Sequence, residues 1–126
     1  MTAIHLDSNF IAAVGIEGSL EAGMFAQWII SGSTVAVSAM AWAEFLCGPS
    51  PEQILTSITS VLGESVPVTT DDASHAARLF NATGRRRGSL ADCIIAAVAI
   101  RSDAAIATND LTHFRRFAEF GLRIAE

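Results

Sequence analysis

The sequence predicts a three-layer α/β/α sandwich built around a mainly parallel sheet of about five strands. Three observations support this fold class. Short apolar runs alternate along the chain with longer stretches of helical character, which is typical of parallel sheets. The apolar runs are bounded by Gly, Ser, Pro or Asp, as buried parallel strands usually are. The chain is also 51% hydrophobic, which is enough to bury a core.

The candidate strands are short runs that end or begin at such boundary residues. The first closes at Asp7, the fourth begins after Asp103, and the last begins after Gly121. The expected strands span residues 3–7, 34–38, 66–69, 104–107 and 122–124.

Helices are expected to fill the intervals between these strands. The clearest start is Ser50-Pro51-Glu52-Gln53, where Ser50 would cap the helix and Pro51 would take its first position. Gly48 and Gly63 would end the helices before them. The expected helices span residues 9–15, 19–31, 39–47, 51–62, 71–86, 90–101 and 111–119.

The length of 126 residues predicts a single domain over residues 1–126. No apolar run reaches the roughly 18 residues of a membrane span. The N-terminus lacks the basic region and cleavage site of a signal peptide, so we expect a cytoplasmic protein without membrane contact. Cys47 and Cys93 are expected to be small buried hydrophobic residues, because neither a disulfide nor a zinc site fits their context.

The formal net charge is −5, and all eight basic residues are arginine. This acidity argues against nonspecific nucleic-acid binding by the whole surface, although it leaves a nucleic-acid enzyme open. Arginine suits phosphate geometry better than lysine does. Arg85, Arg86 and Arg87 could instead complement the dipole of the helix that ends near them. The candidates for phosphate contacts are Arg85, Arg86, Arg87, Arg115 and Arg116.

Four carboxylates each stand as the sole charge in an apolar or neutral stretch, namely Asp7, Glu44, Asp92 and Asp110. Such stretches are expected to be buried, and burying an unpaired carboxylate costs several kcal/mol or raises its pKa. A shared divalent cation would explain all four acids, because hard cations prefer carboxylate oxygens and remove their mutual repulsion.

The expected elements place these acids near one edge of the sheet. Asp7 ends the first strand, and Asp110 follows the fourth. Glu44 falls on the helix after the second strand, and Asp92 falls in the first turn of the helix before the fourth. Ligands of open α/β sheets collect outside the carboxyl ends of the strands. We therefore expect Glu44 and Asp92 to reach this edge from flanking helices.

Each acid also has a simpler interpretation. Asp7 and Asp110 could cap the helices that follow them, and Asp92 could complete a capping box begun by Ser89, each cap contributing about 1 kcal/mol. Glu44 could face solvent on an amphipathic helix. One metal site explains the four acids together better than four separate roles do.

The remaining polar residues are interpreted as structural. His5 is expected to be a packed strand residue, and His75 and His113 are expected to lie on helix surfaces. Asp71 and Asp72 are expected to cap and charge a helix N-terminus.

The acidic motifs resemble, in order and spacing, those of PIN-domain ribonucleases from about residue 3 to the end. The third motif is the most specific of them. The motifs are Leu6-Asp7-Ser8-Asn9-Phe10-Ile11, Ala43-Glu44-Phe45-Leu46-Cys47-Gly48, Leu90-Ala91-Asp92-Cys93-Ile94-Ile95-Ala96-Ala97 and Ala107-Thr108-Asn109-Asp110, with Phe114 following. Short chains of this kind resemble the VapC toxins of bacterial toxin–antitoxin pairs.

The resemblance implies a PIN-like fold and cleavage of RNA that depends on Mg²⁺, with Mn²⁺ as a substitute. It matches Thr108 and Asn9 to residues that support the site. It further implies a homodimer and a cognate antitoxin that blocks the site, with DNA contacted only through that antitoxin. The acidic metal and catalytic site carries over to Asp7, Glu44, Asp92 and Asp110.

Two other function classes remain open. A phosphatase of another α/β fold would use Asp7 as nucleophile, but such enzymes usually begin Asp-x-Asp and use a lysine. Here the start is Asp7-x-Asn9, and the chain has no lysine. A noncatalytic module would keep the acids for metal or partner binding. RNA cleavage that EDTA abolishes would distinguish the nuclease from both.

Overall fold

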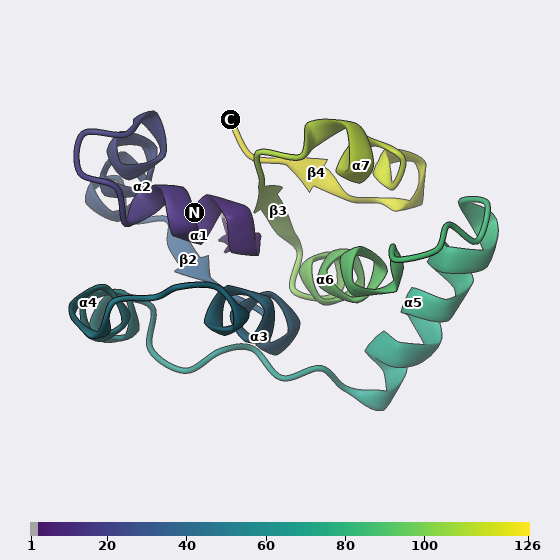
Figure 1. The fold of residues 1–126 in the computed structure, drawn as a ribbon. Helices are drawn as coiled ribbons and strands as arrows, with labels where there is room; N and C mark the ends of the chain where they lie inside the picture. The colour runs from purple at the N-terminus through teal and green to yellow at the C-terminus, as the bar shows by residue number, and fades with distance from the viewer. Residues whose placement is uncertain (1–2) are drawn as a thin grey trace.

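The sheet at the centre of the molecule is parallel. The computed structural model describes residues 3–126. Within that range the strands are Ala3–Leu6 (β1), Thr34–Ala36 (β2), Ala104–Ala107 (β3) and Arg123–Ile124 (β4). They lie in the order β2-β1-β3-β4, and every neighbouring pair is parallel (Figure 1). The predicted α/β fold with a parallel sheet is confirmed, with four strands instead of about five.

The strand expected at 66–69 is reduced to one bridge in the part of the chain that is described. Val66 pairs in parallel with Ser38, donating to the Val37 carbonyl and accepting from the Ala39 amide, both at 2.8 Å. Ser38 is already the N-cap of the next helix, since its hydroxyl accepts from the Ala41 amide at 3.1 Å. The segment that pairs with Val66 therefore enters helix α3 directly after Ser38, before a second pair of residues can form a β-bridge.

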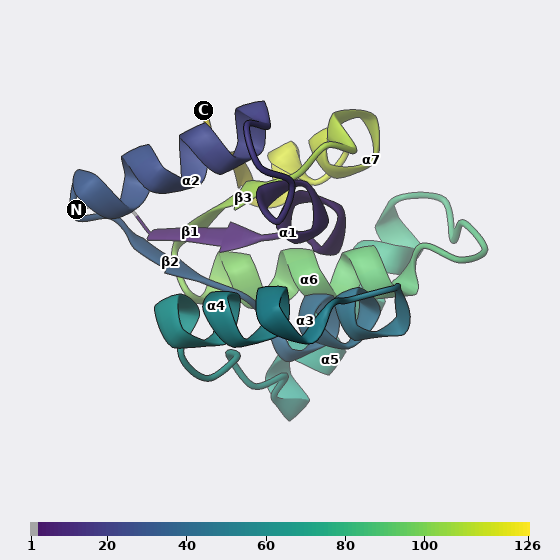
Figure 2. The same ribbon diagram turned by 60° about the vertical axis from the view of Figure 1, so that its left-hand side comes forward.

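Helices cover both faces of the sheet. Ser8–Val14 (α1) and Leu20–Ile30 (α2) lie on one side with Leu111–Arg115 (α7) (Figures 1 and 2). The opposite side carries Ala39–Cys47 (α3), Glu52–Leu62 (α4), Thr70–Ala82 (α5) and Leu90–Arg101 (α6). A short 3-10 helix, Ala118–Phe120, leads into β4. None of the helices in residues 3–126 has the length and apolar content to cross a membrane.

Helix α6 is the most deeply buried helix and positions one end of the site. The helix carries its own apolar side chains on several faces, as expected of a helix packed within a core. Its buried residues are Cys93, Ile95, Ala96, Ala97, Val98 and Ala99. The adjoining strand β3 is buried along its whole length. Because this core fixes α6 against the sheet, it also fixes the first turn of α6, which carries Asp92.

Two local predictions are wrong and one is confirmed. Pro51, not Ser50, occupies the N-cap of α4, because the Ser50 hydroxyl turns back to donate to the Phe45 carbonyl at 3.2 Å. Cys47 is exposed at the end of α3, where only one helix face meets the core. Asp72 forms the expected cap: with Thr69 it makes a reciprocal capping box at the start of α5.

Candidate active site

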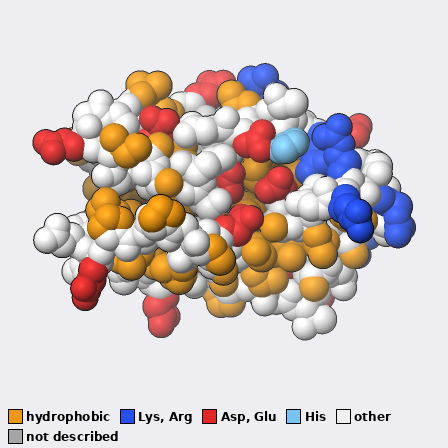
Figure 3. Space-filling model, viewed as in Figure 1, with side chains coloured by type: hydrophobic (Ala, Val, Ile, Leu, Met, Phe, Trp, Pro, Cys, Tyr) orange, Lys and Arg blue, Asp and Glu red, His pale blue; other side chains and the backbone are white. Residues whose placement is uncertain are grey.

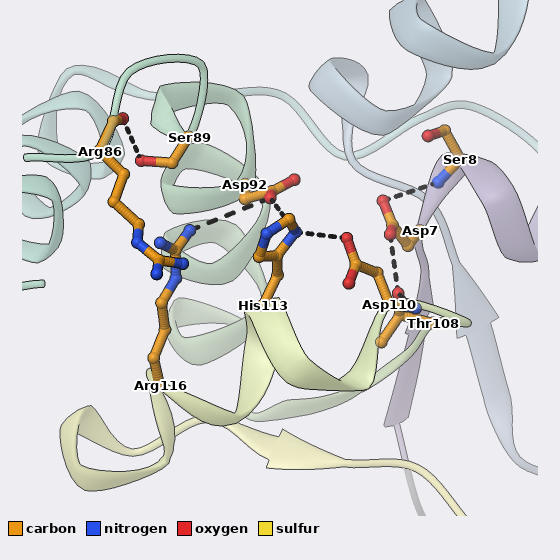
Figure 4. A network of polar contacts seen from close by, with 9 residues as sticks. All are labelled: Asp7, Ser8, Arg86, Ser89, Asp92, Thr108, Asp110, His113 and Arg116. Atoms are coloured by element: carbon orange, nitrogen blue, oxygen red, sulfur yellow. Dashed lines mark hydrogen bonds and ion pairs between the residues drawn. The ribbon is translucent and has the colours of Figure 1, made fainter.

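Asp7 and Thr108 follow neighbouring strands at the same edge of the sheet. Strands β1 and β3 pair with Leu6 opposite Ala107, so the residues after both strands meet beyond their carboxyl ends. The Asp7 amide donates to the Ala107 carbonyl at 2.9 Å. The Thr108 hydroxyl donates to the Asp7 carboxylate at 2.8 Å (Figure 4). The strand register thus joins two residues that are 101 positions apart.

The carboxylate of Asp7 is bound on both oxygens and is nearly closed to solvent, with 4% of the residue exposed. Oδ1 accepts from the Ser8 amide at 2.8 Å, so Asp7 does cap α1. Burial raises the pKa of Asp7 and the charge of Asp110 adds to the rise, while hydrogen bonds from Thr108 and Ser8 oppose it. Capping explains one oxygen of Asp7 but does not explain why the charge is buried.

Thr108 also ties Asp110 to this position. The Asp110 amide donates to the Thr108 hydroxyl oxygen at 2.9 Å, so one side chain connects the two acids. Asp110 takes the N-cap position of α7, but within residues 3–126 its side chain makes no cap hydrogen bond. Its Oδ2 instead lies 2.5 Å from Nδ1 of His113. The capping interpretation of the Asp110 side chain is therefore wrong.

Asp92 reaches the same place from α6. The capping box with Ser89, which was the alternative interpretation of Asp92, is not formed in the described chain: the Ser89 hydroxyl donates to the Arg86 carbonyl at 2.7 Å. Oδ2 of Asp92 lies 3.9 Å from Nδ1 of His113 and 4.0 Å from Nη2 of Arg116. Burial and then the charge of Asp7 raise the pKa of Asp92, and His113 and Arg116 oppose the rise.

Glu44 belongs to the same electrostatic group and is half-buried on α3. Burial is the main cause that raises the pKa of Glu44, followed by the charges of Asp7 and Asp92, while a hydrogen bond with the Ser8 side chain lowers it. A side chain that faced open solvent would not be affected in this way. The structure thus brings together the four acids that the sequence analysis singled out.

His113 is the residue of this group that the sequence analysis missed. It was interpreted as a helix-surface residue, and its side chain is indeed 47% exposed. Its ring nevertheless lies between the carboxylates of Asp110 and Asp92 (Figure 4). The spacing of three between Asp110 and His113 was the available signal, because residues three apart share one helix face. His5, by contrast, is a buried strand residue as expected.

Asn9 contacts the loop that carries Asp110. Its side-chain oxygen accepts from the Asn109 amide at 3.1 Å, and the Asn109 side chain donates to Glu21 at 3.1 Å. These contacts hold the loop between β3 and α7 against α1 and α2. The supporting role of Asn9 stays a prediction, and its contact with Asn109 is the observation that bears on it.

The arginines separate into two groups. Arg86, Arg87 and Arg116 line a pocket of about 380 Å³ together with Asp92 and His113. In the space-filling view, acidic side chains gather in the middle of this face, with a histidine beside them and basic side chains beyond (Figure 3). The guanidinium of Arg116 lies over the ring of a neighbouring phenylalanine, 4.7 Å from its centroid. The pocket therefore joins cationic groups directly to the acidic cluster.

The other two arginines lie outside this pocket. Arg85 donates to the Asn81 side chain at 2.8 Å and lies over Phe80 on the neighbouring helix α5. Arg115 is exposed at the end of α7. Because neither side chain lines the pocket, both are weaker candidates for contacts close to the acids.

Residues 4–120 match the sequence model of the PIN domain family. The chain belongs to the PIN domain family. No curated protein sequence matches this PIN domain well enough to count as a relative. The family assignment therefore rests on the match over 4–120 and on the fold.

Solved structures share the fold of this PIN domain along nearly its whole length. The crystal structure of VapBC2 from Rickettsia felis, bound to a promoter DNA fragment, has a chain that aligns with a TM-score of 0.77 at 20% identity, covering 98% of both chains. The crystal structure of FitAcB from Neisseria gonorrhoeae has a chain that aligns with a TM-score of 0.74 at 20% identity, covering 98% of this chain and 96% of that chain. VapC20 from Mycobacterium tuberculosis, a sarcin–ricin loop cleaving toxin, aligns with a TM-score of 0.68 at 18% identity. The alignment covers 97% of this chain and 98% of VapC20.

The donor set of this PIN domain fits a hard divalent cation. The carboxyl pKa values of Asp7, Glu44 and Asp92 are all raised, mainly by burial and in part by the charge of at least one neighbouring aspartate. One donor atom from each of Asp92, Asp110 and His113 lies within 4.8 Å of the other two. A cation bound there would offset the repulsion between the carboxylates, and these residues could supply its ligands.

Proposed function

We propose that residues 1–126 form a single nuclease domain that hydrolyses RNA with Mg²⁺ or Mn²⁺ and acts as the toxin of a toxin–antitoxin pair. The observation that carries this proposal is the grouping of Asp7, Glu44, Asp92 and Asp110, which come from four different elements. The charge of Asp110 adds to the raised pKa of Asp7, and the charge of Asp7 adds to the raised pKa values of Glu44 and Asp92, so these acids interact electrostatically. The PIN family match and the shared fold with VapC20 support the same function.

In this proposal Asp7, Asp92 and Asp110 hold the metal, and Glu44 completes the site. A bound divalent cation would supply Lewis-acid stabilisation of the phosphodiester oxygens and would lower the pKa of a water molecule bound to it. Thr108 keeps the Asp7 carboxylate oriented by its hydrogen bond and fixes the Asp110 backbone through the same hydroxyl. Asn9 is a positioning residue, because it acts through the Asn109 amide.

Arg86, Arg87 and Arg116 are proposed to bind RNA phosphates beside the acids, because they line the adjoining pocket. Arg85 and Arg115 would contact phosphates farther along the strand. The overall charge of −5 limits nonspecific binding, so the local cluster has to provide the attraction for RNA.

The proposed partners are a cognate antitoxin and a second copy of this chain. VapBC2 of Rickettsia felis is bound to promoter DNA in its crystal structure, and we propose that this chain contacts DNA only through such an antitoxin. The side chains of Ile16, Leu20 and Ile30 are exposed, by 62%, 77% and 78%, and they offer apolar surface for protein contacts.

The test is an RNA cleavage assay with the purified protein in Mg²⁺, Mn²⁺ or EDTA. We expect cleavage by the wild type that EDTA abolishes, and only background cleavage by Asp7→Asn and Asp92→Asn. Asp71→Asn is the matched control, because Asp71 is an exposed acid in the first turn of α5. Full cleavage by Asp92→Asn would show that the assigned site is wrong, and metal binding without cleavage would favour a noncatalytic module.

A further inference from the structure

His113 lies on helix α7, and its ring faces the carboxylates of Asp92 and Asp110, where it could act as a metal ligand. Its Nδ1 lies 2.5 Å from Oδ2 of Asp110 and 3.9 Å from Oδ2 of Asp92 (Figure 4). The two acids come from α6 and from the start of α7, so the ring nitrogen faces donors on two separate helices. Nδ1 and one oxygen of each acid lie within 4.8 Å of one another.

A pairing of His113 with Asp110 alone does not account for this placement. A helix-surface contact between residues three apart would explain the short distance to Asp110. It would not require the same nitrogen to face Asp92, which already has Arg116 at 4.0 Å. The same spacing of three lets a carboxylate and a histidine share one metal in helical di-metal proteins. The exposed ring can also adjust its position without disturbing the core.

We propose that His113 is a nitrogen ligand of the metal centre and makes that centre favour Mn²⁺ over Mg²⁺. This inference rests on the proposed metal site and adds a fifth side chain to the four acids. Mn²⁺ also prefers oxygen donors and is the weakest binder of the first-row transition ions, but as a transition ion it accepts an imidazole nitrogen more readily than Mg²⁺, which requires oxygen ligands and keeps several waters. A centre built from carboxylates and one imidazole therefore gains more from Mn²⁺ than a centre built from carboxylates alone.

Pulsed electron paramagnetic resonance of the Mn²⁺-loaded protein tests the bond directly, without reference to activity. We expect the coupling of a directly bound imidazole nitrogen in the wild type and its loss in His113→Ala. His75→Ala is the matched control, because His75 lies on α5 and is outside the donor group formed by Asp92, Asp110 and His113. The coupling should persist in that variant. If it is absent from the wild type, or survives in His113→Ala, the inference is overturned.

Calorimetric titration gives a second and independent measurement. We expect His113→Ala to weaken Mn²⁺ binding by at least about tenfold, since even outer-shell partners of metal ligands change affinity by about 10- to 100-fold. Binding of Mg²⁺ should change by less than about threefold, because Mg²⁺ gains little from nitrogen. Equal losses for both ions would overturn the preference for Mn²⁺.

Asp92→Asn separates this inference from the proposed function. If Mn²⁺ binds the wild type and Asp92→Asn weakens it, but no nitrogen coupling is seen, then the acidic centre stands and His113 is not its ligand. If Mn²⁺ does not bind the wild type, or binds Asp92→Asn equally well, then the metal centre of the proposed function is wrong and the role of His113 is wrong with it.

Discussion

The hydroxyl of Thr108 links two acids of the cluster. Its hydroxyl donates to the buried Asp7 carboxylate and accepts from the Asp110 amide. Thr108→Val keeps the shape but removes both hydrogen bonds, so we expect the free energy of unfolding to fall by about 1–3 kcal/mol. Urea unfolding measures this change. Thr112→Val, at an exposed position of α7, is the control and should change it by less than about 0.5 kcal/mol.

The raised pKa of Asp7 predicts a stability effect with a definite sign. The folded protein binds the Asp7 proton more tightly than the unfolded chain does, so above the ordinary value of 3.8 the charged group destabilises the metal-free fold. Asp7→Asn should therefore be more stable than the wild type at pH 7. That gain should shrink as the pH falls through the raised pKa of Asp7 towards 3.8.

Comparison of the two proteins removes the effect of groups that do not respond to the Asp7 charge. Glu44 and Asp92 do respond to it, and their changed titration acts in the same direction as that of Asp7. His5 has a pKa lowered to about 4, mainly by burial and also by Arg101, and it destabilises both proteins equally as the pH falls below 6.5. Urea unfolding across pH 4 to 7, without divalent metal, gives the difference. A difference that does not vary with pH would contradict the assigned burial of the Asp7 charge.

At the scale of elements, an ion pair between a buried aspartate and a partly exposed arginine joins α5 to α6. Nε of Arg101 donates to Asp72 at 2.8 Å, and Asp72 is 2% exposed. Burial acts to raise the pKa of Asp72, but the bonds from Arg101 and Thr69 lower it overall. This pair therefore stabilises the fold above the ordinary carboxyl pKa and loses its effect below it.

Loss of this pair should loosen the contact between the two helices. Arg101→Gln should lower the free energy of unfolding by about 1–3 kcal/mol, less than for a fully buried pair because Arg101 is 39% exposed. Thermal or urea unfolding near pH 7 measures the change. Arg78→Gln, at an exposed position of α5, should leave stability nearly unaltered. Equal effects of the two substitutions would argue against the pair as a link between α5 and α6.

The sequence predicted these elements well because their patterns are local. The alternation of apolar runs and helical stretches was enough to predict the parallel sheet and the edge where Asp7 and Asp110 meet. The strand at 66–69 could not be excluded in this way, because its loss depends on Ser38 capping α3. The position of the His113 ring beside two acids could not be predicted from the sequence either, because it depends on Asp92 approaching from a distant segment.

At the scale of the whole molecule, charge is unevenly distributed over an acidic protein. Arg86 and Arg87 line a pocket beside the acids although the net charge is −5. If each contacts one phosphate, Arg86→Gln with Arg87→Gln should reduce the slope of log affinity against log salt by about 1.4 for single-stranded RNA. Filter binding in EDTA over a salt series measures the slope.

The matched control for this charge effect is Arg123→Gln. Arg123 is paired with Asp103 at 3.4 Å and lies on β4, away from the pocket. Its removal should leave the salt dependence unchanged. An equal loss of slope in both proteins would mean that RNA responds to total charge and not to the pocket.

The proposed function requires carboxylates from distant parts of the chain to hold one divalent cation at the edge of the sheet. The most direct measurement is an anomalous difference map from crystals soaked in Mn²⁺. We predict a peak within bonding distance of the carboxylate oxygens of Asp92 and Asp110, on the side that faces Asp7. A soaked crystal whose peaks all lie elsewhere, with the acidic cluster free of any ion, would contradict the proposed metal site.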